Sequence, residues 1–188
     1  MRVISGSARG RPLKAVPGNG TRPTADKVKE AMFQMIGPYF DGEQVLDLFA
    51  GTGGLGIEAL SRGAAGAVFV DLDPKAVATV RANLAEAKPE GAETEVYRND
   101  AMRALKALAR RGCVFDLIFL DPPYRMRDAD QYLLFMDEHG MVRAGAKAVI
   151  EHESSAEYPE EIGRFSLAKR SDYGDTAVSI YRYAKEVQ

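Results

Sequence analysis

The sequence predicts an α/β fold built on a doubly wound, mostly parallel sheet, and three observations support this expectation. From residue 45 onward, short apolar runs of strand length alternate with segments of helical periodicity, which is the pattern of βαβ units. A glycine-rich turn joins the first apolar run to the helix that follows it. The last two apolar runs are separated only by a short Gly/Asp turn, so the sheet should end with an antiparallel pair.

The first forty residues differ in composition from the rest of the chain. Two β-prone runs, 2–5 and 13–16, stand among Gly, Arg and Pro residues and predict a hairpin-like arm. Residues 24–36 follow with apolar side chains at helical spacing, and Thr24 is the expected N-cap. These 40 residues hold seven Lys/Arg and two Asp/Glu, a net of +5, whereas the other 18 Lys/Arg and 25 Asp/Glu give −7. We therefore expect 1–40 to be a basic extension and 41–188 to be the main domain.

Seven strands and the helices between them account for the remainder of the chain. Asp73 and Pro74 form an N-cap and first-turn pair, so one helix should begin there. The other expected helices cover 55–62, 101–110 and 129–138. The expected strands cover 45–49, 67–70, 93–97, 115–120, 146–151, 165–168 and 177–183.

The composition is that of an ordinary globular protein, with 46% hydrophobic and 28% charged residues. The apolar runs are too short to span a membrane, and no apolar segment of the signal-peptide type follows Met1. The single cysteine, Cys113, excludes an intrachain disulfide, and the histidines, His139 and His152, lack metal-ligand spacing. We expect a cytoplasmic, monomeric protein that uses neither a metal nor a membrane.

The segment from Asp47 to Gly56 reads Asp-Leu-Phe-Ala-Gly-Thr-Gly-Gly-Leu-Gly and lies between a strand and a helix. In this context, glycines let the backbone approach a ligand at the carboxyl ends of the strands. The spacing of the glycines also fits the dinucleotide motif of an NAD-dependent dehydrogenase. However, the negative charge of Asp47 would repel a pyrophosphate and attract the cationic groups of S-adenosylmethionine. The candidate cofactor-binding residues of this loop are Asp47, Phe49, Ala50, Gly51, Thr52 and Gly53.

Polar residues end the next two strands. Asp71 stands 20 residues after Gly51, where a carboxylate can accept hydrogen bonds from the ribose hydroxyls of either cofactor. Leu72 follows it and completes the candidate site at this strand end. Asn99 and Asp100 follow the third strand and can accept a hydrogen bond from an adenine amino group, although a helix cap is an alternative role for them.

The motif Asp121-Pro122-Pro123-Tyr124 ends the fourth strand. Two prolines remove backbone donors but keep their carbonyl acceptors. Asp121 and a proline carbonyl can therefore accept both hydrogens of an exocyclic amino group, while Tyr124 can stack on the face of a base. In a doubly wound sheet the fourth strand is expected beside the first, so this loop should face the glycine turn. The alternative interpretation is a rigid turn without a catalytic role.

Together, Val45–Gly56, Asp71, Asp100 and Asp121–Tyr124 resemble the motif set of Rossmann-like class I methyltransferases. The N-terminal segments 6–13 and 21–33 extend this match. With them, the chain resembles the small-subunit ribosomal RNA methyltransferase D family, which methylates N2 of a guanine in bacterial 16S rRNA. This resemblance implies a seven-stranded sheet whose last strand is antiparallel. It also implies that residues near Gly51, Asp71 and Asp100 bind S-adenosylmethionine and that Asp121, Pro122, Pro123 and Tyr124 form the catalytic loop.

The predicted function is therefore methyl transfer to the exocyclic N2 of a guanine in 16S rRNA. The expected substrate form is 16S rRNA within a small-subunit assembly particle, with free RNA as the alternative. The basic extension predicts phosphate contacts, and its candidate RNA-binding residues are Arg9, Arg11, Arg22 and Lys27. Three alternatives remain open. They are an NAD-dependent dehydrogenase, an RNA-binding module without activity, and an amino-group methyltransferase acting on adenine N6 or on a protein glutamine.

Overall fold

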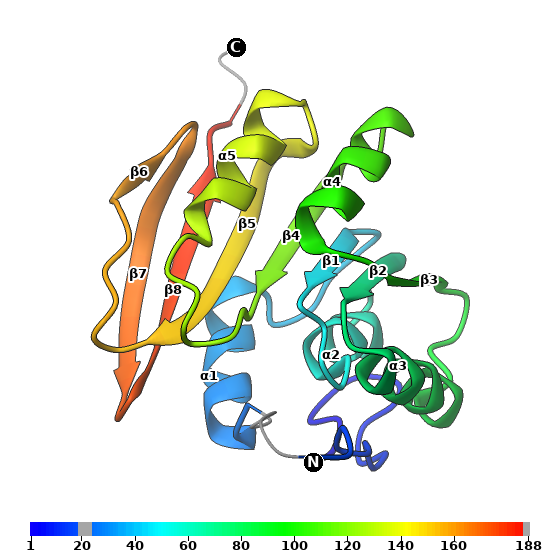
Figure 1. Ribbon diagram of the computed structural model, residues 1–188. Helices are drawn as coiled ribbons and strands as arrows, with labels where there is room; N and C mark the ends of the chain where they lie inside the picture. The colour runs from blue at the N-terminus through cyan, green and yellow to red at the C-terminus, as the bar shows by residue number, and fades with distance from the viewer. Residues whose placement is uncertain (19–23, 186–188) are drawn as a thin grey trace. The chain divides into compact units, whose positions relative to one another are not determined.

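The computed structural model describes residues 1–18 and 24–185. The chain divides into two compact units, Met1–Ala101 and Met102–Gln188, and each is described by itself (Figure 1). Residues 1–40 thus belong to the same compact unit as the glycine loop. Their separation from 41–188 as an extension with its own task stays a prediction.

The first unit contains a parallel sheet of order β3-β2-β1. Leu46 of β1 pairs with Val68 of β2, which pairs with Glu95 of β3. The predicted N-cap at Asp73 is confirmed, because its side chain accepts a hydrogen bond from the amide of Lys75 at 2.9 Å. The elements of this unit are α1 (Asp26–Ile36), β1 (Gln44–Leu48), α2 (Gly54–Ser61), β2 (Gly66–Asp71), α3 (Pro74–Ala87) and β3 (Glu93–Arg98).

The second unit contains a mixed sheet of order β4-β5-β8-β7-β6. Strands β4 and β5 are parallel, whereas β8 lies antiparallel between β5 and β7, as the sequence predicts for the end of the sheet. Helix α4 begins at the end of the first unit. The elements are α4 (Ala101–Arg110), β4 (Phe115–Leu120), α5 (Asp130–Glu138), β5 (Val142–Glu153), β6 (Glu161–Ile162), β7 (Phe165–Tyr173) and β8 (Thr176–Tyr183).

The described residues form eight strands, one more than the seven predicted. The additional strand, β6, consists of Glu161 and Ile162 and pairs with Ser166 and Phe165 of β7. Two residues show no alternation of apolar and polar side chains, so no sequence pattern could reveal this strand. In the described part of the chain, no helix is long and apolar enough to cross a membrane.

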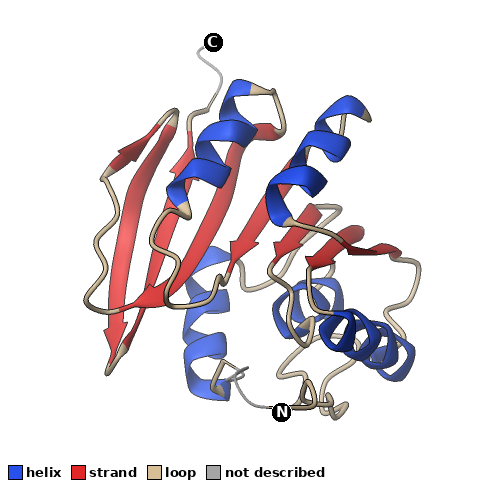
Figure 2. Cartoon of the chain, in the orientation of Figure 1, coloured by secondary structure: helices blue, strands red, loops and turns tan. Residues whose placement is uncertain are grey.

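The predicted hairpin of the arm, residues 1–18, forms only in part. Arg2 and Pro12 make a single antiparallel bridge, and the run 13–16 forms no strand, so Figure 2 draws the arm as loop. The amide of Lys14 instead donates to Asn83 Oδ1 of α3 at 2.7 Å. The second β-prone run therefore bonds in two directions: the amide of Leu13 donates to the carbonyl of Met1 at 2.9 Å, and the amide of Lys14 donates to a side chain of α3.

Helix α1 differs from its prediction in two respects. Its N-cap is Ala25, which makes no side-chain cap bond, so the expectation that Thr24 caps the helix is wrong. The buried face consists of Lys29, Met32, Phe33 and Ile36, whereas the pattern of apolar residues predicts a stripe that includes Val28 and Met35. A lysine occupies the buried stripe because it has a charged partner elsewhere in the unit, described below.

Candidate cofactor site and catalytic loop

The glycine loop follows β1 and is held at the carboxyl end of β2. The amide of Ala50 donates to the carbonyl of Val70 at 2.9 Å, and the amide of Gly53 donates to the carbonyl of Ala50 at 2.8 Å. Phe49, Gly51 and Gly53 all have positive φ values, of 64°, 57° and 78°. A positive φ is unusual for a phenylalanine, and such strain is common at functional loops. The predicted strand-to-helix turn is therefore a tight and defined loop.

Gly56 is needed for packing. A Cβ atom at this position would lie 2.4 Å from Cε1 and 2.8 Å from Cζ of Phe69 on β2. Its amide donates to Oδ2 of the buried Asp47 at 2.9 Å. Asp47 therefore satisfies an otherwise unpaired amide in the first turn of α2, and the helix can approach the sheet closely only because residue 56 has no side chain.

The electrostatic state of Asp47 differs from that of a surface carboxylate. Its side chain is 1% exposed, and burial raises its pKa to about 8, against the opposing effect of the hydrogen bond from Gly56. A pKa near 8 favours the protonated form of Asp47 near neutral pH. The predicted attraction between Asp47 and a cationic ligand stays a prediction, and it requires that the ligand favour the ionised form.

Asp71 at the end of β2 connects the glycine loop to the start of α3. Its Oδ2 accepts a hydrogen bond from the amide of Gly51 at 2.8 Å, and its Oδ1 accepts one from the amide of Asp73 at 2.9 Å. Each carboxylate oxygen can accept two hydrogen bonds, so each has capacity for one more. The side chain is partly exposed, so Asp71 can accept hydrogen bonds from two hydroxyl groups while the amides of Gly51 and Asp73 fix its orientation.

The predicted residues that follow β2 and β3 lie close to Asp71 in the backbone network. The amide of Asn99 donates to the carbonyl of Asp71 at 3.1 Å, and the Asn99 side chain accepts from the amide of Asp100 at 2.9 Å. Leu72 is 66% exposed and offers an apolar surface next to the carboxylate. The first unit thus brings together the loop, Asp71, Leu72, Asn99 and Asp100. Their binding of a cofactor stays a prediction.

The Asp-Pro-Pro-Tyr segment lies at the end of β4 in the second unit. Pro122 is buried and Asp121 is partly exposed, whereas Tyr124 is 41% exposed. The hydroxyls of Tyr124 and Thr176 are 2.6 Å apart, so the tyrosine ring is anchored to the start of β8. The carbonyl of Pro123 accepts a hydrogen bond from the amide of Met126 at 2.8 Å. The carbonyl of Pro122 is therefore the better candidate acceptor, and the catalytic role of the loop stays a prediction.

The predicted RNA-binding residues are exposed where the structure describes them. Arg9, Arg11 and Lys27 lie on the surface of the first unit, and Arg11 is 3.9 Å from Glu86. Arg22 lies outside the described residues. Lys29, which contributes to the positive charge of 1–40, is buried and is not available to a ligand.

Comparison with known proteins relates this arrangement to a family. A protein-family profile described as conserved hypothetical protein 95 matches residues 1–182. YlbH of Bacillus subtilis, provisionally named an rRNA methyltransferase, is 53% identical over 182 residues, which are 97% of this chain and 98% of YlbH. Ribosomal RNA small subunit methyltransferase D of Escherichia coli is 34% identical over 182 residues, which are 97% of this chain and 89% of that protein.

The chain belongs to the small-subunit ribosomal RNA methyltransferase D family. A solved structure of yhhF from Escherichia coli, provisionally named a methyltransferase, has a TM-score of 0.82 and 32% identity. The match covers 99% of each chain. The expected class I methyltransferase fold is thereby confirmed.

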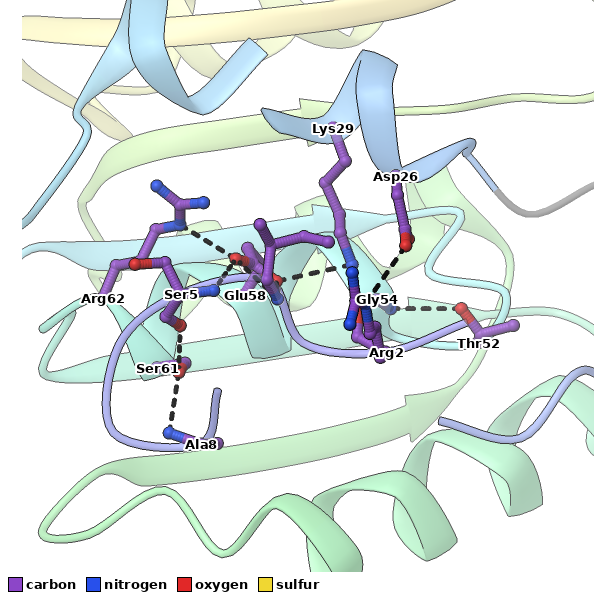
Figure 3. A network of polar contacts seen from close by, with 12 residues as sticks. Arg2, Ser5, Ala8, Asp26, Lys29, Thr52, Gly54, Glu58, Ser61 and Arg62 are labelled. Atoms are coloured by element: carbon purple, nitrogen blue, oxygen red, sulfur yellow. Dashed lines mark hydrogen bonds and ion pairs between the residues drawn. The ribbon is translucent and has the colours of Figure 1, made fainter. Parts of the chain in front are cut away.

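The first unit also contains a buried charge cluster that was not predicted from the sequence (Figure 3). Glu58 of α2 is completely buried and pairs with Arg62 at 2.9 Å and with Lys29 at 3.4 Å. Its carboxylate also accepts hydrogen bonds from the amides of Ile4 and Ser5. Glu58 and Lys29 thus attach the arm to the body of the first unit, since Lys29 also donates to the carbonyl of Arg2, while Arg62 compensates the charge of Glu58. All three are residue types normally expected on a surface.

Asn83 makes a second attachment that sequence reasoning missed. Its amide nitrogen donates to the carbonyls of Lys14 and Thr52, at 3.0 and 2.9 Å. Asn83 therefore links the arm to the glycine loop from within α3. The only signal in the sequence was an asparagine on the face of a helix, and such a residue is indistinguishable from a solvent-exposed one without its partners.

Proposed function

We propose that this chain is an S-adenosylmethionine-dependent methyltransferase that modifies the exocyclic N2 of a guanine in 16S rRNA. The observation that supports the proposal best is the carboxylate of Asp71, fixed by the Gly51 and Asp73 amides with one acceptor position left on each oxygen. This carboxylate belongs to a chain that is related along nearly its whole length to a small-subunit rRNA methyltransferase.

The residues of the first unit fit the proposed cofactor. Asp71 would accept from the two ribose hydroxyls, Leu72 would contact a purine ring, and Asn99 or Asp100 would accept from the adenine amino group. Gly51 and Gly53 leave the loop backbone open to close approach. When bound, S-adenosylmethionine supplies an electrophilic methyl group on a sulfonium.

In this proposal, the second unit prepares the acceptor nitrogen. Asp121 accepts one hydrogen of the guanine amino group and the carbonyl of Pro122 accepts the other, which draws the nitrogen lone pair out of conjugation with the ring. Tyr124 stacks on the base, and its bond to Thr176 limits the orientations of the ring. A bound S-adenosylmethionine would supply the methyl group by direct displacement, with S-adenosylhomocysteine as the leaving group, and Asp121 or water would take the proton that the amino nitrogen loses.

Alignment of the two reactants is the main contribution that these residues make. Effects of this kind supply roughly 7–11 kcal/mol in well-oriented reactions. No nucleophilic side chain is required. Cys113, which follows α4, is partly buried, and its amide donates to the carbonyl of Leu108. The target base must be unstacked before it can reach the loop, because its amino group is otherwise paired or covered.

The decisive experiment is nucleoside mass spectrometry of 16S rRNA from cells with and without the gene. Loss of one N2-methylguanosine in the deletion strain, restored by the purified protein with S-adenosylmethionine, is the expected result. Incubating the protein with free 16S rRNA and with small-subunit particles would identify the substrate form. Unchanged N2-methylguanosine, together with the loss of a methyladenosine, would refute the guanine assignment.

The dehydrogenase alternative is tested separately. Gly51, Gly53, Gly56 and Asp71 satisfy the dinucleotide spacing, so spacing does not distinguish the two cofactors. The midpoint temperature of thermal unfolding should rise with S-adenosylhomocysteine and remain unchanged with NAD, because a ligand that binds the folded state stabilises the protein. The reverse pattern would favour a dehydrogenase.

A further inference from the structure

The first unit contains a cavity that shares no lining residue with the glycine loop or Asp71. The arm forms one wall, and α1 with Tyr39 after it forms another. The volume is about 390 Å³. Ligand pockets commonly have volumes of about 300–1,000 Å³. We call it the arm cavity, and the lining residues that matter here are Arg2, Ser5, Arg9, Glu30, Gln34 and Tyr39.

Tyr39 presents an aromatic face at this cavity. It is 65% exposed, and its hydroxyl lies 3.2 Å from Oγ of Ser5. A tyrosine that packs into a core buries its ring, whereas this one holds its hydroxyl against the arm and leaves the ring accessible. Such a ring can stack on a nucleic-acid base, a contact that suits every base because each has a π-face.

Two arginines supply positive charge beside this ring. Arg9 is exposed, and within the described part of the chain its guanidinium makes no ion pair. Arg2 is 3.5 Å from Asp26, with both side chains substantially exposed, so this pair is weak and open to exchange. Arg62 also lines the cavity, but its charge is compensated by Glu58, and Glu30 is the acid among the residues named above.

The wall formed by the arm is fixed in place before any ligand arrives (Figure 3). The Glu58 carboxylate accepts hydrogen bonds from the amides of Ile4 and Ser5, and the amino group of Lys29 donates to the carbonyl of Arg2 at 2.8 Å. Oγ of Ser61 donates to the carbonyl of Ser5 at 2.6 Å. The backbone from the carbonyl of Arg2 to the carbonyl of Ser5 is therefore held by buried groups, which lowers the entropic cost of binding at this cavity.

We propose that the arm cavity binds one nucleotide of a single-stranded RNA segment, at a position other than the methylated base. Tyr39 stacks on its base, Arg9 and Arg2 contact its phosphate, and Gln34 can hydrogen-bond to the base edge. An exposed aromatic ring beside solvent-exposed arginines is the combination that single-strand binding uses. The inference rests on the proposed function in that the bound strand is part of the rRNA substrate.

The proposal is tested with the full chain and a fluorescein-labelled single-stranded adenosine decamer, by anisotropy. Tyr39→Ala should weaken binding by about fivefold to a hundredfold, the range for one lost stacking contact. Tyr39→Phe should bind within about twofold of the wild type, because the ring face is retained. Arg9→Ala should lower the slope of log affinity against log salt by about 0.7, the value for one phosphate contact on a single strand.

Tyr97→Ala and Arg110→Ala are the matched controls. Tyr97 is 39% exposed, Arg110 is exposed on α4, and neither lines the arm cavity. Both should bind the decamer as the wild type does. Photocrosslinking to a 4-thiouridine decamer, read by peptide mass spectrometry, should modify the peptide that contains Tyr39. Equal affinity of Tyr39→Ala, Tyr97→Ala and wild type, with no crosslink at Tyr39, would overturn the proposal.

The outcomes separate this inference from the proposed function. If the wild type methylates 16S rRNA but Tyr39→Ala leaves its KM for RNA unchanged, the subsite is wrong and the function stands. If the decamer binds through Tyr39 but no rRNA is methylated, the subsite stands and the function is wrong. Binding of polyglutamate in place of RNA, lost in Arg9→Ala, would overturn the RNA assignment in favour of an acidic protein partner.

Discussion

Glu58→Ala is the change whose consequence the structure defines most sharply. The carboxylate is completely buried and has four partners, namely Lys29, Arg62 and the amides of Ile4 and Ser5. Removing one partner of a buried ion pair costs about 3–5 kcal/mol, because the other charge stays buried without compensation. Here two cations lose their partner at once, so we expect a loss of at least about 3 kcal/mol in the free energy of unfolding.

The assay is urea unfolding followed by circular dichroism, together with hydrogen exchange of the Ile4 and Ser5 amides. Glu58→Gln keeps the hydrogen-bond acceptor and should lose less stability than Glu58→Ala. The triple variant Glu58→Leu, Lys29→Met and Arg62→Met removes all three charges and should be more stable than Glu58→Ala, since apolar groups of similar size often replace buried ions without loss. In Glu58→Ala and in the triple variant, which lack the acceptor, the Ile4 and Ser5 amides should exchange faster. A wild-type unfolding midpoint and wild-type amide protection in Glu58→Ala would refute the reasoning.

The remaining predictions concern the cofactor site and the catalytic loop. Asp71→Ala should weaken S-adenosylhomocysteine binding by about 1.5–3 kcal/mol, the scale of hydrogen bonds to a charged group; unchanged affinity by calorimetry, with the fold intact, would remove Asp71 from the site. Asp47 has a pKa raised to about 8 by burial, so the folded state holds a proton that the unfolded state releases near pH 4, and stability should fall as the pH rises from about 4 to 8. Asp47→Asn should lose less free energy of unfolding than the wild type between pH 5 and pH 8, as measured by urea unfolding. An equal loss in both proteins would contradict the assignment. Asp121→Ala should reduce single-turnover methylation by at least about a hundredfold, roughly 2.7 kcal/mol, while Tyr124→Ala should cost about 1–3 kcal/mol of stacking and Tyr124→Phe should be nearly silent. Near wild-type methylation by Asp121→Ala would mean that the loop is only a rigid turn.

The sequence was sufficient for features whose partners are close along the chain or follow a regular period. The parallel strands, the loop at Gly51 and the cap at Asp73 were predicted because alternation of apolar runs and short-range turn chemistry carry the information locally. Gly51 and Asp71 were assigned to one candidate site from the sequence, and the structure joins them by a hydrogen bond because the carboxyl ends of neighbouring parallel strands lie at one edge of the sheet. These features define the proposed cofactor site.

The tertiary structure alone decided how the arm is held and which charges are buried. Glu58 lies 54 residues from Ile4 along the chain, and Asn83 lies 69 residues from Lys14, so no local pattern marks either pair. Lys29 occupies the buried stripe of α1 although its residue type predicts exposure, because Glu58 compensates its charge there. The pKa of Asp47 likewise depends on desolvation, a property of the packed surroundings and not of the residue itself. The sequence by itself determined the order of the strands along the chain and the chemistry at their ends, whereas burial and long-range pairing arise only once the chain is folded.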